Sequence, residues 1–250
     1  MATKKKNKKP PKPIAFGNNT IRVRMYRVGF GDCFLLSLPV AEVDADGDTH
    51  RHVLIDCGVH FGGDLKMMDR AVDHIAETTK RKLAIVIATH SHQDHISGFS
   101  NKFSSFEIGE VWLPWCEDVR DKQAVKLQKK HIALTEKLRQ HFEAEARRAP
   151  VSKTRAAAMA AVANLVQNKT ALTLLRGGFN VNAQVRYLNA SDFLKNAGGI
   201  TGLSANILGP PRDEKFLAKM DPPAGQSYLR MAGNQSERLD AVQPFADRWR

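Results

Sequence analysis

The most informative stretch of the sequence is residues 83–95, Leu83-Ala84-Ile85-Val86-Ile87-Ala88-Thr89-His90-Ser91-His92-Gln93-Asp94-His95. Its first part, Leu83–Ala88, is a short unbroken apolar run rich in β-branched residues, which is typical of a strand buried on both faces. Its second part places three histidines and one aspartate within six residues, directly after that strand. Packing alone does not explain such a cluster. We interpret it as a ligand-bearing loop at the carboxyl end of a strand in an α/β protein.

The residues before this loop predict the rest of an α/β arrangement. Apolar residues alternate with polar ones over residues 21–25, and a second apolar run, Cys33–Leu38, follows a glycine-rich turn, so two tightly joined strands are expected. A further strand is expected to begin at Val53. Apolar residues recur at helical spacing over Lys66–Thr79, which predicts a helix before the buried strand.

The composition changes after a further strand predicted near Val111-Trp112-Leu113. Residues 119–147 and the alanine-rich residues 153–167 are predicted to form two helices divided at Ala149-Pro150. A third short helix is expected to end at Gly177-Gly178. On the first helix, one stripe is predicted to carry the apolar side chains and two histidines: Ala124, Leu127, His131, Leu134, Leu138 and His141/Phe142.

The final part of the chain contains little pattern. Short β-like runs return at Val185–Leu188 and Ala205–Leu208, and the sequence from Gly209 to Arg250 is polar, with little periodicity. We find no internal repeat.

The overall composition predicts a folded cytoplasmic protein. With 42% apolar residues among 250, the chain can bury a full core. No apolar run is long enough to cross a bilayer, and the lysine-rich N-terminus has no apolar stretch behind it, so neither a membrane partner nor a secretory signal is expected. Cys33, Cys57 and Cys116 show no C-x-x-C spacing, which favours reduced thiols.

The net charge of +12 is concentrated in two segments. Residues 1–12 hold six lysines and no acidic residue, and we expect a disordered basic arm there. Residues 119–176 hold thirteen Lys/Arg against four Asp/Glu, so the rest of the chain is slightly acidic.

The histidine loop has the ligand types and the spacing of a metal site. Two imidazoles two residues apart, His90 and His92, can turn toward one point, and Asp94 and His95 can serve a neighbouring point, so one loop can supply ligands to two metal ions. Imidazole and carboxylate suit Zn²⁺ best, while Mn²⁺ or Fe²⁺ accept the same ligands. Such a metal acidifies water toward a pKa of ~7 and provides a hydroxide nucleophile at neutral pH.

These residues carry a resemblance to a known family. The string Ala88–Phe99 resembles the H-x-H-x-D-H signature of the metallo-β-lactamase superfamily. Leu54-Ile55-Asp56-Cys57-Gly58 is similar to the superfamily's upstream strand, which ends in an aspartate. Val28–Leu35 is similar to the opening hairpin of its competence-protein-like branch. The three segments occur in the superfamily's order and lie between residue 21 and about residue 115.

The resemblance implies an αββα sandwich with the metal site at the sheet edges. By position, His90 and His92 would bind one metal, and Asp94 and His95 the second. Asp94 would also position the water and is therefore the candidate catalytic residue. Asp56 would orient the metal loop through hydrogen bonds behind the ligands; its alternative is an ordinary turn aspartate at a strand end.

The sequence also departs from the superfamily, in which a later His, a bridging Asp and a final His complete the two-metal shell. No histidine follows His141. His131 and His141 are expected to be core or groove histidines, with ligation as the alternative. The later aspartates follow no convincing buried strand, so none is selected as the bridging ligand among Asp192, Asp213, Asp221 and Asp240.

The chain is therefore expected to be the first half of such a hydrolase. The expected organisation is a basic arm over residues 1–18, the half-domain with its metal loop over 19–118, a helical insertion over 119–176, and return strands with an irregular segment over 177–250. Three interpretations of the missing ligands follow. The sequence is a fragment of a longer protein, which is the simplest, or a partner supplies the remainder, or the site is incomplete and inactive.

The expected reaction is metal-assisted hydrolysis of an ester, lactam, thioester or phosphodiester. A basic helical stretch beside the metals favours an anionic substrate, such as a phosphodiester or nucleic acid, although basic residues also form ordinary solvated helix faces. Trp112 and Trp115 either line a pocket mouth or pack in the core. The alternatives to an enzyme are a non-catalytic basic binding module and a fragment that exposes apolar sheet surface.

Overall fold

The computed structural model describes residues 19–40, 47–60, 62–148, 156, 158–160, 162 and 169–217. The chain divides into two compact units, Met1–Pro211 and Arg212–Arg250, and α6 (Glu214–Leu217) is the element described in the second unit. The predicted basic arm, most of the predicted helix over 153–167, and Asp221 and Asp240 lie outside the described residues.

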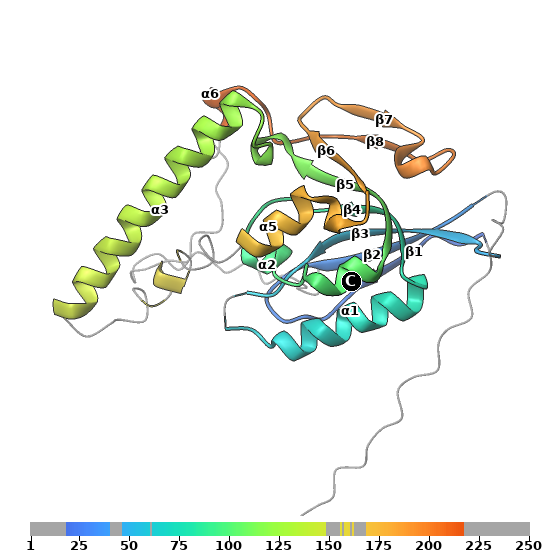
Figure 1. Cartoon of the computed structure of the whole chain (residues 1–250), viewed down its shortest axis with the longest axis horizontal. Helices are drawn as coiled ribbons and strands as arrows, with labels where there is room; N and C mark the ends of the chain where they lie inside the picture. The colour runs from blue at the N-terminus through green and yellow to red at the C-terminus, as the bar shows by residue number, and fades with distance from the viewer. Residues whose placement is uncertain are drawn as a thin grey trace, which may run out of the picture. The chain divides into compact units, whose positions relative to one another are not determined.

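A six-stranded mixed sheet forms the centre of the first unit (Figure 1). The strand order follows the chain, β1-β2-β3-β4-β5-β6. The first two pairings are antiparallel and the remaining three are parallel. The strands are β1 (Arg22–Met25), β2 (Cys33–Pro39), β3 (His50–Cys57), β4 (Lys82–Ile87), β5 (Glu107–Pro114) and β6 (Gln184–Leu188). The chain is therefore an α/β protein, as the sequence predicts.

The helices connect the parallel strands. α1 (Leu65–Thr79) lies between β3 and β4, and the short α2 (Gln93–Ile96) contains Asp94 and His95, the last residues of the histidine loop. α3 (Lys122–Arg148) and α5 (Lys169–Arg176) lie between β5 and β6. The smaller elements are the 3₁₀ turns η1 (Asn101–Ser105), η2 (Trp115–Glu117), η3 (Gly178–Asn180) and η4 (Ala197–Gly199), and the hairpin of β7 (Phe193–Lys195) and β8 (Ser204–Asn206).

One face of the sheet packs against α1 and α5 to form the larger core. Leu54 and Val86, on neighbouring parallel strands, are fully buried there against Ile75 of α1 and Leu175 of α5. Asp64 caps the start of α1 by accepting hydrogen bonds from the main-chain N–H groups of the first turn. This packing fixes the carboxyl ends of β3 and β4, which carry the histidine loop and the aspartate before it.

The opposite face is covered over only part of the sheet. Val53, Ile85 and Trp112 pack there against the β7–β8 hairpin and the η4 turn, and Ile85 is 1% exposed. β4 is thus buried on both faces, which confirms the prediction. The predicted alternation of β1 is also present, but its apolar residues lie on the exposed side, where Val23 is 65% exposed.

Helix α3 confirms the predicted helix but corrects the face that it buries. Ala124 is buried near η2, where the side chain of Gln128 donates to the carbonyl of Cys116. Beyond these first turns α3 extends away from the sheet (Figure 1). The prediction that His131 and His141 lie on the apolar, packed side is therefore wrong: both are exposed, and Leu134 is 56% exposed.

No helix in the described part of the chain is both long enough and apolar enough to span a bilayer.

Candidate metal centre

The histidine loop lies where two parallel strands end. β3 and β4 pair in parallel up to Ile55 and Ile87, so their carboxyl ends meet at one edge of the sheet. Asp56 follows on β3, and the loop follows β4 and leads into α2, with His92 as the N-cap residue. This edge brings together the aspartate and the histidine loop that the sequence separates by more than thirty residues.

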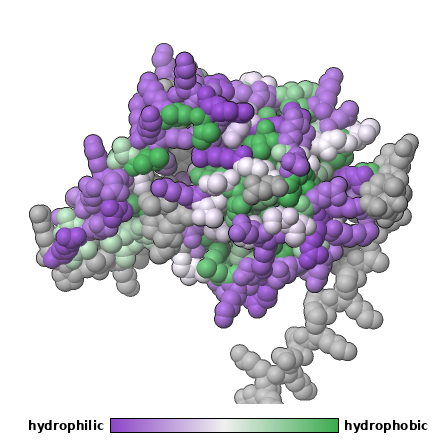
Figure 2. Space-filling view, in the orientation of Figure 1, coloured by the Kyte–Doolittle hydropathy of each residue, from purple (hydrophilic) through white to green (hydrophobic). Residues whose placement is uncertain are grey.

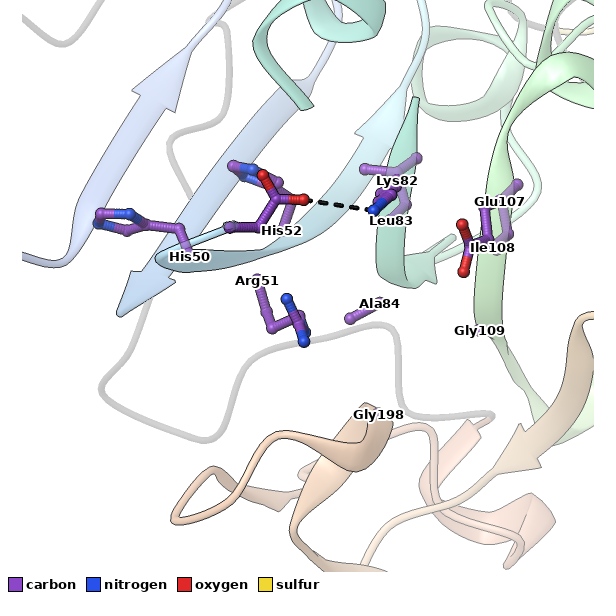
Figure 3. A pocket seen from close by; sticks show the side chains of 11 residues that line it. His50, Arg51, His52, Lys82, Leu83, Ala84, Glu107, Ile108, Gly109 and Gly198 are labelled. Atoms are coloured by element: carbon purple, nitrogen blue, oxygen red, sulfur yellow. Dashed lines mark hydrogen bonds and ion pairs between the residues drawn. The ribbon is translucent and has the colours of Figure 1, made fainter. Parts of the chain in front are cut away.

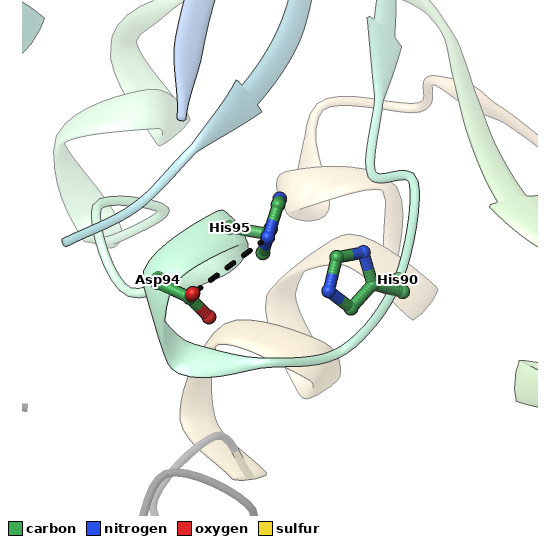
Figure 4. Close-up of side chains that lie close together, drawn as sticks. All are labelled: His90, Asp94 and His95. Carbon is green, nitrogen blue, oxygen red and sulfur yellow. Dashed lines mark ion pairs between the residues drawn. The ribbon is translucent and has the colours of Figure 1, made fainter. Parts of the chain in front are cut away.

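The side chains of His90, Asp94 and His95 converge at this edge (Figure 4). Each offers a ligand atom that lies within 4.8 Å of those of the other two. The rings of His90 and His95 have centroids 3.7 Å apart, and the ring of His92 lies 4.6 Å from that of His90. His90, Asp94 and His95 therefore form one group of potential ligands that suits Zn²⁺, and His92 lies beside His90 without belonging to that group.

Asp56 lies behind these ligands and is 3% exposed. Its Oδ1 accepts a hydrogen bond from the Thr89 main-chain N–H at 2.7 Å, and its Oδ2 accepts one from the Thr89 hydroxyl at 2.6 Å. The same Oδ2 is 2.9 Å from Nδ1 of His95. With the Nδ1 proton donated to Asp56, Nε2 of His95 keeps its lone pair and lies 3.8 Å from Asp94 Oδ2.

The backbone at Asp56 adopts the left-handed conformation, with φ at 51°. Aspartate tolerates this region better than most residues other than glycine. Asp56 is the extra residue at a register shift within the β2–β3 pairing, between the pairs Phe34–Ile55 and Cys33–Cys57, and its carboxylate reaches Thr89 and His95 after β4.

The electrostatic environment favours neutral imidazoles. Burial, followed by the neighbouring imidazoles of His95 and His92, lowers the pKa of His90. Burial also lowers the pKa of His92, and the nearby imidazoles of His95 and His131 lower it further. Neutral imidazole is the form that binds metals.

Glycines bring the main chain of three segments into contact beneath the loop. A Cβ atom on Gly58 would collide with the main chain of Asp94 and His95, and one on Gly31 would lie 2.9 Å from the carbonyl oxygen of Asp94. Ser97, just after the loop, accepts a hydrogen bond from Val59 N at 2.9 Å and donates one to Val59 O at 3.0 Å. The loop is therefore held by main-chain packing as well as by its side chains.

Asp32 is a member of this site that the sequence reasoning did not select. A second group of potential ligand atoms within 4.8 Å of one another consists of Asp32, Asp56 and His95. Oδ2 of Asp32 is 3.5 Å from Nδ1 of His95. The sequence does contain a signal for Asp32. It ends the turn Gly29-Phe30-Gly31-Asp32, directly before an apolar strand, just as the histidine loop stands directly after one.

The remaining predicted candidates lie elsewhere. His131 is close enough to influence the pKa of His92, but among the described residues it belongs to neither ligand group, and the same holds for His141. Asp192 accepts hydrogen bonds from Asn189 within a turn, and Asp213 accepts one from Lys215 N in the second unit.

Trp112, Trp115 and the cysteines contribute to the packing of the described fold. Trp112 is 4% exposed and donates to Glu110, and Trp115 is fully buried, so both pack in the interior instead of lining a pocket mouth. The three cysteines are free thiols, as predicted, and Cys33 and Cys57 face each other across β2 and β3.

A cavity of about 300 Å³ lies at the other end of the sheet, where β3, β4 and β5 begin (Figure 3). Arg51, His52, Lys82 and Glu107 line it, with Gly198 on the far side. Burial lowers the pKa of His52 to about 4, and Lys82 pairs with Asp48. None of the residues of the histidine loop lines this cavity. The candidate metal centre is therefore identified by its potential ligand atoms and not by a cavity.

Comparison with known proteins gives no further identification: no family model matches the chain, and neither the curated proteins nor the solved structures contain a match.

Proposed function

We propose that this chain is a metal-dependent hydrolase whose centre is the loop from His90 to His95 and whose substrate is anionic, such as a phosphodiester or nucleic acid. The observation that carries the proposal is the convergence of His90, Asp94 and His95, with the ring of His92 beside them. Structural histidines are usually dispersed, and four potential ligands on one six-residue loop are the arrangement expected of a metal centre.

The residues fit zinc, with manganese or iron as the alternatives. In the proposed centre His90 and His92 would hold one ion, and Asp94 and His95 would hold a second. Bound zinc supplies Lewis acidity and lowers the pKa of water to ~7, which is the chemistry that hydrolysis requires at neutral pH.

The chain's own side chains have distinct tasks in this proposal. Asp56 accepts a hydrogen bond from the Nδ1–H of His95 and keeps Nε2 directed to the centre. Asp94 has a quarter of its side chain exposed, with Oδ2 on the Nε2 side of His95, so this oxygen can accept a proton from a water molecule. Thr89 fixes the Asp56 carboxylate through its hydroxyl and its main-chain N–H.

The charge of α3 supports an anionic substrate. The helix contains eight basic and three acidic residues. Figure 2 shows hydrophilic residues along it, interspersed with paler ones. His131 on α3 contributes to the lowered pKa of His92, so this helix passes near the loop. Positive charge next to a hydrolytic centre raises the local concentration of phosphodiesters.

We also propose that the fold is of the metallo-β-lactamase type, a sandwich in which a second sheet packs on the first. Two features support this. The strand, helix, strand and loop order places the ligands at the sheet edge, and the sheet face opposite α1 is apolar beyond the β7–β8 hairpin. On that face Met25 pairs with Phe34, and Val23 with Leu36. Met25 is 69% exposed, so this apolar surface suits a further layer.

Metal content and hydrolysis together test the function. The purified chain is equilibrated with Zn²⁺ and desalted, its metal content is measured by mass spectrometry, and hydrolysis of bis(p-nitrophenyl) phosphate is followed. We expect at least one ion per chain and loss of hydrolysis in His92→Ala. The matched control is His74→Ala, which removes an imidazole of α1 that contacts Tyr26. A content well below one ion per chain would overturn the proposal.

The charge of α3 also favours a second candidate, a basic module that binds nucleic acid without hydrolysing it. It predicts binding to a fluorescent oligonucleotide that weakens steeply with salt and is unchanged in His92→Ala. Binding of that kind, without turnover by the zinc-loaded wild-type chain, would favour this candidate over the hydrolase.

A further inference from the structure

We infer that Asp32 is a positioning residue of the proposed metal centre, acting with Asp56 as a carboxylate pair around Nδ1 of His95. This inference rests on the proposed function, because it assigns to Asp32 the task of directing Nε2 of His95 toward a bound metal. Asp32 comes from the turn between β1 and β2, a segment far in sequence from the histidine loop.

The two carboxylates stand at different distances from the same ring nitrogen. Oδ2 of Asp56 is 2.9 Å from Nδ1 of His95, which is a hydrogen bond, and Oδ2 of Asp32 is 3.5 Å away. Nδ1 carries one proton and can donate fully to only one acceptor. Asp32 therefore acts mainly through its charge, which stabilises the proton on Nδ1 and makes Nε2 a stronger metal ligand.

Asp56 has little capacity left to accept further hydrogen bonds, and this gives Asp32 a distinct task. Its Oδ1 accepts from Thr89 N, and its Oδ2 is shared between the Thr89 hydroxyl and His95. A carboxylate whose oxygens already accept three hydrogen bonds offers less electron density to each donor. The second carboxylate restores negative charge on the Nδ1 side of the ring.

The main chain of Asp32 fixes the turn to the site independently of the side chain. Asp32 N donates to the carbonyl of Asp94 at 2.9 Å, and Gly58 N donates to the carbonyl of Asp32 at 3.0 Å. The side chain itself is 41% exposed. Substitution of the side chain therefore leaves the two main-chain contacts in place, so the electrostatic and the structural contributions of Asp32 can be separated.

The test compares Asp32→Asn, Asp32→Ala and Asp32→Glu with wild type in the full chain. Zinc affinity is measured by competition with a chromogenic chelator, and the thermal midpoint is measured without metal. We expect Asn and Ala to weaken zinc affinity about tenfold, as loss of a group behind a metal ligand does, with Glu restoring part of it. The matched control is Asp73→Asn, an exposed carboxylate of α1 that pairs with Lys102.

A readout on the metal-free protein separates positioning from a structural role. The ring ¹⁵N shifts of His95 report which nitrogen carries the proton. We expect the Nδ1–H form in wild type and a mixture of both tautomers in Asp32→Asn, with thermal midpoints that agree within the error of the measurement.

The outcomes distinguish the two proposals. If wild type binds zinc and the Asn and Ala variants bind it within twofold of wild type, the assignment of Asp32 is wrong and the proposed function stands. If affinity falls only together with the metal-free thermal midpoint, Asp32 has a structural role and the assignment is again overturned. If wild type binds no zinc, the proposed function fails, and the assignment of Asp32 fails with it.

Discussion

Asp56 and Thr89 are joined by two hydrogen bonds, one from the Thr89 main chain at 2.7 Å and one from its hydroxyl at 2.6 Å. These bonds connect the end of β3 to the beginning of the histidine loop after β4. The pairing of these two parallel strands therefore helps to fix the positions of the side chains in the proposed metal centre.

Thr89→Val should destabilise the fold, because the buried Asp56 carboxylate loses one donor while the shape of residue 89 is preserved. We expect a loss of about 1.5–3 kcal/mol in the free energy of unfolding, the range for a hydrogen bond to a charged group. Urea denaturation measures it. Thr89→Ser retains the hydroxyl and should stay near wild type; an equal loss in both variants would contradict the explanation.

Asp56→Ala should be more damaging than Asp56→Asn. Alanine removes all side-chain acceptors and also places a less tolerant residue at a φ of 51°, whereas asparagine keeps an acceptor and tolerates the left-handed region. We expect alanine to cost about 2–4 kcal/mol, from the lost hydrogen bonds and the strain together. Denaturation of both variants without metal provides the comparison, and equal losses would contradict both the acceptor and the backbone explanation.

Gly58→Ala should disrupt the centre even though the new side chain is one methyl group. Its Cβ would collide with the main chain of Asp94 and His95, so the loop must move. We expect a loss of about 2–4 kcal/mol, typical of overpacking against rigid backbone, with weakened zinc binding.

Gly62→Ala is the matched control for this collision. Gly62 has a φ of 80°, but a Cβ there meets no atom within 4 Å, so the variant should show only the cost of the left-handed backbone, about 1–2 kcal/mol. If the two variants lose the same stability, the close packing under the loop is not important.

The cavity at the other end of the sheet should make stability depend on pH. Burial lowers the pKa of His52 to about 4 from an ordinary value near 6.5. The unfolded chain therefore takes up a proton at His52 as the pH falls below about 6.5, before the folded chain does. Above about pH 6.5 His52 is neutral in both states, and the folded state loses stability progressively as the pH falls from 6.5 to about 4.

We expect His52→Gln to flatten this decline, by on the order of 1–3 kcal/mol at pH 4. Unfolding free energies of both proteins across pH 4–8 measure the effect. His141→Gln, which alters an exposed histidine of α3, is the comparison, and a decline equally steep in His52→Gln and wild type would exclude His52 as its source.

Charge reversal on α3 should affect anionic substrates selectively. Lys122 and Lys129 are exposed, and their replacement by glutamate reverses positive charge on α3 without altering a buried contact. If the chain hydrolyses phosphodiesters, we expect KM for an oligonucleotide to rise about tenfold in low salt, while KM for a neutral ester changes little. Equal changes for both substrates would indicate altered folding instead of altered electrostatics.

The sequence predicts the elements whose patterns are local. The β4 strand, α1 and α5 follow from periodicity and caps, and the histidine loop follows from residue type and spacing. The alternation of β1 predicts a strand but does not show which side is covered. Whether Val23 is buried depends on what lies against the sheet, and that information is not local.

The parts that the sequence did not predict depend on long-range packing. Asp32 joins His95 only because β2 pairs with β3 and the turn before β2 then lies against the loop. β7 has three residues, too few to show a period. The exposure of His131 results from the direction of α3, which its own sequence does not fix.

The contacts of Gly31 and Gly58 with the loop backbone have a kinetic consequence. Because main-chain atoms from two other segments already support the loop, the proposed ligands would be preorganised before any ion arrives. Capture of an ion by the proposed centre would then require little ordering of the polypeptide and should not be slowed by a conformational change.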